Sequence, residues 1–271
     1  MRYGFCTDTA TLTRGEVEYS LVRRIKEAGF DFVEFPLMMI DTLPDAAFER
    51  LLAELRSLKL DCDCACNYFP GSIKVVGPTA DKEAINAYLE HSMERARRMG
   101  TKKIVFGSCP SRNLPEGVSE EDGYRQLLDV INTCIIPACE RFGIYVVIEP
   151  IRRQSANFIV TLKDGQKLVN LADAPEIMLL ADLMHMNCNE EDPADLHAVF
   201  PSLCHVHLCE RDRVLPEESY SPYLADCLKI LVESGYDGTI SFESKDAVSP
   251  DGLRKALDLL KSIFNHGDHS A

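Results

Sequence analysis

The asymmetry of its connecting segments is the feature that most constrains how this chain folds. Helical patterns give way to apolar, strand-like runs across very short joints that centre on glycine: Gly29, Gly100, Gly143 and Gly235. Glycine in this place is typical of a left-handed helix stop. The joints from strand to helix are long instead: 67–79, 108–119, 150–160 and 209–219. Short joints at one end of a parallel sheet and long loops at the other predict a barrel with its site at the carboxyl ends of the strands.

Strand-like runs alternate with helical patterns along the whole chain. The runs are short, apolar and rich in β-branched or aromatic residues, as expected of strands buried on both faces. They lie near 2–6, 31–36, 60–66, 102–107, 144–149, 177–182, 203–208 and 238–243. The helical segments lie near 15–28, 45–58, 80–99, 120–142, 161–171, 193–199, 220–234 and 250–265. With a length of 271 residues, this pattern predicts one α/β domain, a single (β/α)8 TIM barrel over 1–265, followed by a short C-terminal tail at 266–271.

An open, doubly wound sheet is the alternative fold. No GxGxxG or GxxxxGK[ST] motif follows any of the strand-like runs, which disfavours the nucleotide-binding forms of that sheet. Several helices also carry start signals of their own. Thr13 and Ser119 each stand at the head of a capping-box pattern, and Ser249 precedes Pro250 as an N-cap before a first-turn proline.

Composition narrows the classes of partner. A net charge of −14 disfavours nucleic-acid binding, because phosphate contacts need clustered lysine and arginine. No apolar run approaches the ~18 residues that a membrane helix needs. Eleven cysteines without a CxxC spacing, and an N-terminus without a secretory pattern, favour a reducing cytoplasmic location. We therefore expect a cytoplasmic protein that binds neither nucleic acid nor membrane.

Four metal-capable residues end four successive strand-like runs in the second half of the chain. They are Glu149, Asp182, His207 and Glu243. Taken singly, each has a plain structural interpretation, such as a helix cap or an ion-pair partner. In a parallel barrel all four gather at one end, and three carboxylates with one imidazole form an oxygen-rich divalent-metal site. We predict that these four residues bind one divalent metal ion.

Polar residues near this set are candidates for substrate contact. His185 lies beyond the strand end in ADLMH, where it faces the pocket or the solvent. Arg213 follows His207 in HLCERDR and can bind substrate oxygens, lock a carboxylate ligand or face water. His205 shares a strand face with His207 but lies one layer deeper, and we interpret it as a core or supporting residue.

A cation between two glutamates suits carbanion chemistry. The cation would stabilise the enediolate of a bound sugar, and Glu149 and Glu243 would act as the acid–base pair. Proton return to the opposite face of the same carbon gives epimerisation, whereas return to the next carbon gives aldose–ketose isomerisation. The predicted activity is therefore that of an isomerase, either a sugar epimerase or an aldose–ketose isomerase.

These motifs resemble a known family. The matching stretches are IEP at Glu149, DLMH at Asp182 and His185, HVHLCERDR at His207 and Arg213, and SFES at Glu243, together with FPGSIKVVGP and FGSCPSRNLP. Over nearly its whole length the chain resembles the xylose isomerase-like TIM barrel superfamily, within it the group of D-tagatose epimerase-type ketose epimerases. The resemblance implies manganese, magnesium or cobalt at the four ligands, with zinc also compatible. It also implies that His185 and Arg213 contact a small carbohydrate, free or phosphorylated.

One position departs from that group. Ser155 stands where these epimerases usually carry a second glutamate that touches the substrate, and the chain has no tryptophan. We predict that Ser155 is a substrate contact at this position and that it opens the pocket, in which case Arg152, Arg153 or Arg112 can meet an anionic substrate. Phe69, in loop 67–79, is a further candidate substrate contact. That loop either forms a lid, packs against the rim or makes a dimer contact.

Three other functions fit parts of the pattern. A dehydratase of the inosose-dehydratase type uses the same metal enediolate to expel a hydroxyl group, and a non-catalytic sugar-binding barrel keeps the pocket without turnover. An abasic-site nuclease of the same superfamily needs more histidine ligands and a basic surface, and this chain has neither. A homo-oligomer, dimer or tetramer, is also expected from the behaviour of such barrels.

Overall fold

Eight parallel strands close into a barrel in the computed structural model, which describes residues 1–7, 12–13, 16–216, 218–245 and 249–266. Around the barrel the strand order is β1-β10-β9-β8-β7-β6-β5-β4, so neighbours in sequence are neighbours in space. The strands are β1 (Arg2–Cys6), β4 (Phe32–Pro36), β5 (Cys64–Cys66), β6 (Lys103–Phe106), β7 (Tyr145–Ile148), β8 (Ile177–Asp182), β9 (Leu203–Leu208) and β10 (Thr239–Phe242). The predicted (β/α)8 TIM barrel is confirmed.

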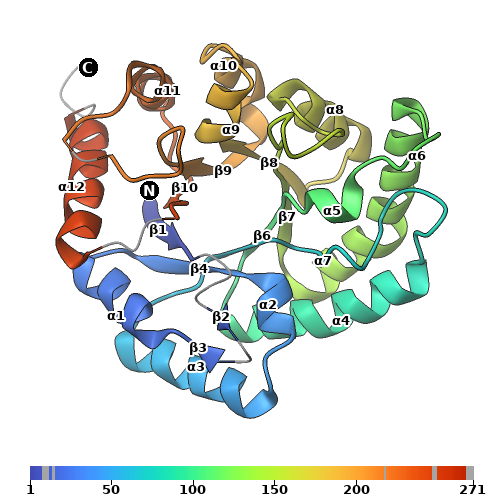
Figure 1. The fold of residues 1–271 in the computed structure, drawn as a ribbon, viewed down its shortest axis with the longest axis horizontal. Coiled ribbons are helices and arrows are strands. Elements are labelled where there is room, and N and C mark those ends of the chain that lie inside the picture. Colours follow the sequence, from blue (N-terminus) through green and yellow to red (C-terminus); the bar gives the residue numbers. More distant parts are fainter. Residues whose placement is uncertain (8–11, 14–15, 217, 246–248, 267–271) are drawn as a thin grey trace.

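Helices ring the strands on the outside (Figure 1). The outer helices are α1 (Tyr19–Ala28), α3 (Asp45–Leu58), α4 (Lys82–Met99), α6 (Glu120–Val130), α7 (Ile136–Phe142), α8 (Leu162–Ala172), α10 (Asp195–Val199), α11 (Pro222–Glu233) and α12 (Pro250–His266). Short helices also follow three of the strands: α2 (Leu37–Asp41), α5 (Cys109–Arg112) and α9 (Leu183–Cys188). A single turn of 3-10 helix, η3 (Phe200–Ser202), leads into β9. The sequence pattern indicated none of these four short segments, because each lies inside a loop.

Of the three predicted helix caps, two are confirmed and one is wrong. Ser119 caps α6 by accepting a hydrogen bond from the Asp122 N–H at 3.1 Å, and Ser249 caps α12 through the Gly252 N–H. The predicted cap at Thr13 is wrong, because β2 (Leu12–Thr13) pairs with β3 (Glu16–Val17) as a small antiparallel sheet. Helix α1 therefore begins later, at Tyr19, with Glu18 as its cap.

The expected helix 120–142 is continuous but contains one wider turn. A π-helical segment, η2 (Ile131–Ile135), joins α6 to α7. Pro137 has no N–H to donate to the preceding turn, and a π-turn is a common way for a helix to accommodate such a break.

Apolar side chains form two main cores and a small third cluster of Ile151, Ala156 and Val160. The larger one lies between the barrel and the helices, and the smaller one fills the barrel interior with Cys6, Cys66, Val105, Val147 and Leu180. The barrel is therefore a packed body rather than a pore, and polar groups inside it must find partners there. No helix in the described part of the chain combines the length and apolar character needed to cross a membrane. Of the predicted tail, residues 267–271 lie outside the described residues.

Candidate metal centre and pocket

Four side chains meet at the carboxyl ends of β7, β8, β9 and β10. Glu149 and Glu243 directly follow β7 and β10, while Asp182 is the last residue of β8 and pairs in register with His207 of β9. One ligand atom from each of the four lies within 4.8 Å of all the others. We call these four residues the ligand layer.

Asp182 divides its two oxygens between different tasks. Its Oδ1 atom caps α9 by accepting hydrogen bonds from the N–H groups of Met184 at 2.8 Å and His185 at 3.0 Å. Its Oδ2 atom is buried and forms no hydrogen bond among the described residues, and His185 Nε2 lies 3.5 Å from it. Burial, with the nearby charge of Glu243, raises the pKa of Asp182 to about 6. A buried oxygen without a donor is costly unless a cation binds it, so this atom fits a metal site.

The His207 ring faces the ligand layer with one nitrogen and the barrel interior with the other. Nδ1 lies 3.2 Å from Glu149 Oε1 and 3.5 Å from Glu243 Oε2, and Nε2 lies 3.2 Å from Glu34 Oε1. Burial alone would lower the pKa of His207, but the three carboxylates raise it well above its usual range. Nδ1 is therefore the ring atom placed to join a cation, and Nε2–H is placed to donate to Glu34.

Glu34 is the functional neighbour that the sequence interpretation missed. It is fully buried in β4, where its Oε2 atom lies 3.2 Å from His205 Nε2 and accepts a 2.7 Å hydrogen bond from Ser241 Oγ. Burial raises its pKa, but His207 and His205 reverse this and hold it well below its usual range. The available signal was a charged residue inside the apolar run FDFVEFP, because a buried carboxylate requires partners.

Beneath the ligand layer the hydrogen bonds continue without a gap. His205 Nδ1 lies 2.7 Å from Thr239 Oγ1, which also accepts a 2.9 Å hydrogen bond from Lys103 Nζ. Burial lowers the pKa of His205 despite the adjacent Glu34 charge. We call Glu34, His205 and Thr239 the support layer. Among the described residues, each of their side-chain nitrogens and oxygens has a partner.

Arg213 and His185 border the ligand layer on its open side. Arg213 NH1 lies 2.7 Å from Glu243 Oε2, and NH2 lies 3.3 Å from His185 Nε2. Burial would raise the pKa of Glu243, but His207 and Arg213 hold it well below its usual range. Burial lowers the pKa of His185 to about 4, so its imidazole is neutral near pH 7.

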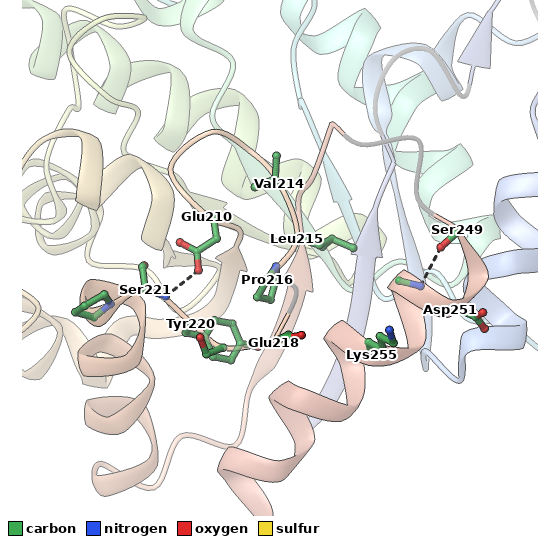
Figure 2. A pocket seen from close by; sticks show the side chains of 13 residues that line it. Glu210, Val214, Leu215, Pro216, Glu218, Tyr220, Ser221, Ser249, Asp251 and Lys255 are labelled. Carbon is green, nitrogen blue, oxygen red and sulfur yellow. Dashed lines mark hydrogen bonds between the residues drawn. The ribbon is translucent and has the colours of Figure 1, made fainter.

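A pocket of about 420 Å³ opens beside Glu149 and Glu243. All four residues predicted to contact substrate line it: Phe69, Ser155, His185 and Arg213. Its volume falls within the range of about 300–1,000 Å³ that is usual for small-molecule sites. A larger pocket of about 1,090 Å³ lies elsewhere, between the β9–α11 loop and the start of α12, and contains none of the predicted site residues (Figure 2).

Loop 67–79 places its aromatic residues in the core. Tyr68 and Phe69 are buried, and the Phe69 ring packs 5.4 Å from Tyr88 and 5.3 Å from Phe106, measured between centroids. The Phe69 N–H also donates a 2.9 Å hydrogen bond to Ser108 Oγ. Of the alternatives for this loop, the contacts support packing against the barrel rim.

Arg112 holds backbone, and this corrects the expectation that it meets an anionic substrate. It is fully buried, and its guanidinium donates to the carbonyl oxygens of Phe106 at 2.5 Å, Glu149 at 2.6 Å and Ile159 at 3.3 Å. Burial lowers its pKa to about 10. Arg112 does not line the pocket, whereas Arg152 does.

Gly107 leaves space for the Glu149 carboxylate. A Cβ atom at this position would lie 2.0 Å from Glu149 Oε2 and 3.1 Å from its Cδ. Only glycine lets the end of β6 approach this carboxylate so closely.

The strands form a closed parallel barrel, and acidic and imidazole side chains cluster at their carboxyl ends. This arrangement is that of a TIM-barrel enzyme. The model of the family described as xylose isomerase-like TIM barrel matches residues 22–263. The chain belongs to this family.

Two curated relatives are epimerases. The chain is 25% identical over 235 residues to the 3-dehydro-D-guloside 4-epimerase of Escherichia coli (strain K12), covering 82% of this chain and 85% of that protein. It is 31% identical over 238 residues to the probable ketose 3-epimerase of Synechocystis sp., covering 85% of this chain and 79% of that protein. The prediction of an isomerase-class enzyme is confirmed at the level of the class.

Solved structures agree in fold. D-psicose 3-epimerase from Clostridium cellulolyticum H10, determined with D-tagatose, superposes with a TM-score of 0.83 at 15% identity, covering 97% of this chain and 99% of that one. The IOLI protein, determined with a bound zinc atom, superposes with a TM-score of 0.75 at 16% identity over 100% of both chains. At this identity the likeness concerns the fold alone.

Proposed function

We propose that this protein is a metal-dependent epimerase or isomerase of a small sugar, acting by proton transfer between Glu149 and Glu243. One observation carries the proposal: four ligand atoms within 4.8 Å of one another, two of them from glutamates that line a sugar-sized pocket. The epimerase names of the two curated relatives support the reaction class.

The ligand layer suits one divalent cation. Three carboxylates and one imidazole are ligands that Mn²⁺, Mg²⁺ or Co²⁺ accept, and Zn²⁺ is also compatible. When bound, the cation supplies positive charge where an enediolate oxygen develops. The zinc in the IOLI protein supports a metal in a barrel of this shape.

The two glutamates then divide the proton transfer. One glutamate must start ionised, to accept a proton, and the other protonated, to give one, and the Arg213 ion pair at 2.7 Å favours the ionised form of Glu243. A sugar lying between them loses a proton to one carboxylate and receives one from the other, which inverts the carbon. Neutral His185 and charged Arg213 stand at the pocket wall and would orient the hydroxyl groups by hydrogen bonds.

Deuterium uptake from heavy water tests this function. Wild-type protein with added manganese should incorporate deuterium into at least one member of a panel of free and phosphorylated ketoses. Glu149→Gln and Glu243→Gln should each lower the exchange rate by about 10²–10⁴-fold or more, with an unchanged circular dichroism spectrum. Glu210→Gln is the matched control, because that carboxylate bonds the Ser221 N–H outside the ligand layer. Retained exchange in Glu243→Gln would refute the role.

A dehydratase remains the second candidate, since the same residues can serve expulsion of a hydroxyl group. Mass spectrometry separates the two, because only the dehydratase yields a product that has lost water. A barrel that binds sugar without turnover would show binding and no exchange on any member of the panel.

A further inference from the structure

Arg152 is a half-buried cation in the pocket wall with only weak acceptors around it. Its Nε atom lies 3.4 Å from Ser155 Oγ, and its NH1 atom lies 3.9 Å from Met184 Sδ and 3.8 Å from Cys188 Sγ. No carboxylate within the described ranges forms an ion pair with it. Sulfur and a distant hydroxyl oxygen are poor partners for a guanidinium, which prefers the paired oxygens of an anion.

Apart from Lys245, the other charged side chains that line the pocket are already engaged. Arg213 is paired with Glu243, and the two carboxylates that line the pocket, Glu149 and Glu243, belong to the ligand layer. Lys245 lines the same pocket and adds a further positive charge. In a chain of net charge −14, this wall is therefore locally cationic outside the ligand layer.

We infer that Arg152 forms a subsite for an anionic group, a carboxylate or a phosphate, on the sugar that this enzyme converts. The inference rests on the proposed function and names its substrate class. A guanidinium presents two parallel N–H donors to such a group, and the partly buried position strengthens the contact relative to one in bulk water. Ser155, 3.4 Å from Nε, adds a hydroxyl donor on the same side and carries no charge to compete with the substrate.

Matched ketose pairs test the subsite. The probes are D-fructose, D-fructose 6-phosphate and D-fructuronate, and the readout is the ratio of kcat/KM for deuterium exchange on each anionic probe to that on D-fructose. Wild-type protein should favour an anionic probe. Arg152→Gln should lower that ratio by about 10- to 100-fold, as expected for loss of a charged hydrogen-bonded pair.

Arg153→Gln is the matched control. Arg153 is exposed, does not line the pocket, and contacts Asn189 only through its backbone N–H. It should leave the ratio within about twofold. A similar fall in both variants would indicate general electrostatic attraction and would overturn the subsite.

A second variant approaches the subsite from the other side. Ser155→Glu places a carboxylate beside the Arg152 Nε atom and should lower the same ratio while Arg152 is retained. A ratio that Arg152→Gln and Ser155→Glu both leave unchanged would overturn the inference.

Direct binding separates failure of this inference from failure of the proposed function. Calorimetric titration of D-fructose 6-phosphate and D-fructuronate into wild-type, Arg152→Gln and Arg153→Gln protein does not depend on turnover. If no probe exchanges deuterium but Arg152→Gln selectively weakens binding of an anionic probe, the function fails and the subsite stands. If D-fructose exchanges deuterium and all three proteins bind the anionic probes equally, the function stands and the subsite fails.

Discussion

The ligand layer and the support layer use similar residue types one level apart inside the same barrel, and they differ in how their polar atoms are satisfied. In the support layer, Glu34 contacts His207, His205 and Ser241, and His205 contacts Thr239. In the ligand layer, Asp182 Oδ2 is buried without a hydrogen-bond partner among the described residues. The layer that faces the pocket is therefore the one that still has binding capacity.

The two layers divide stability from chemistry within one barrel. A buried polar group that is fully partnered fixes geometry, whereas an unsatisfied one is costly unless something binds it. The support layer holds the His207 ring through Glu34, and under the proposed function the ligand layer would present Nδ1 and the carboxylates to a cation.

Removal of divalent metal should abolish proton exchange while the barrel stays folded. A cation contributes several kcal/mol to stabilising enediolate charge, so dialysis against EDTA should lower exchange by about 10³-fold or more. Added Mn²⁺ should restore it, and it should also raise the melting temperature, because only the folded state assembles the four ligands. If protein shown to be free of metal still exchanged protons at the full rate, the ligand layer would not act through a metal.

Gly107→Ala should damage the ligand layer from outside it. The new Cβ would lie 2.0 Å from the present position of Glu149 Oε2, so the carboxylate would have to move. A misplacement of about 1 Å at a reacting group costs about 10²-fold in rate. Exchange kinetics measure the effect. Gly117→Ala is the control. Its new Cβ would meet no atom within 4 Å, but the alanine would be held at φ +82°, so the variant should lower the melting temperature and leave the exchange rate unchanged. Equal rates in the two variants would contradict the role of Gly107.

Glu34→Gln should weaken metal binding without removing a ligand. Outer partners of a ligating histidine typically contribute about 10- to 100-fold in metal affinity, and Glu34 is the carboxylate on His207 Nε2. Calorimetric titration with Mn²⁺ gives the dissociation constant independently of turnover. Glu210→Gln, which changes a glutamate outside both layers, should bind Mn²⁺ as wild type does. Unchanged affinity in Glu34→Gln would mean that His207 is oriented without it.

Acid should weaken metal binding before it unfolds the protein. Burial raises the pKa of Asp182 to about 6, so below that pH the carboxylate is protonated and the cation must displace the proton. The dissociation constant for Mn²⁺ should therefore rise by about tenfold or more for each unit that the pH falls below about 6. Above that pH the Asp182 contribution to this dependence should vanish. A flat dependence between pH 5 and pH 6 would show that Asp182 does not compete with protons for the metal.

The sequence predicted the strands and the ligand layer because both follow from periodicity. Short apolar runs that end at Glu149, Asp182, His207 and Glu243 lie at the same end of any parallel barrel, whatever the details of packing. The roles of these residues, and the dimer or tetramer, remain predictions.

Long-range partners were what the sequence could not supply. Glu34 stands in the middle of an apolar run, and its role depends on His205 and His207, which lie more than 170 residues away in the chain. Arg112 looked like a loop cation because its three carbonyl partners come from separate segments. Thr13 carries a good capping pattern, but pairing of β2 with β3 overrides that local preference.

Arg112 also bears on how barrels of this kind acquire new substrates. By holding the carbonyl groups of Phe106, Glu149 and Ile159, it anchors the backbone that carries the Glu149 side chain, independently of the side chains at the pocket mouth. Substitutions at positions 152 and 155 can then alter which molecule enters the pocket while Glu149 keeps its position. Evolution can therefore explore new sugars at the mouth without rebuilding the catalytic machinery beneath it.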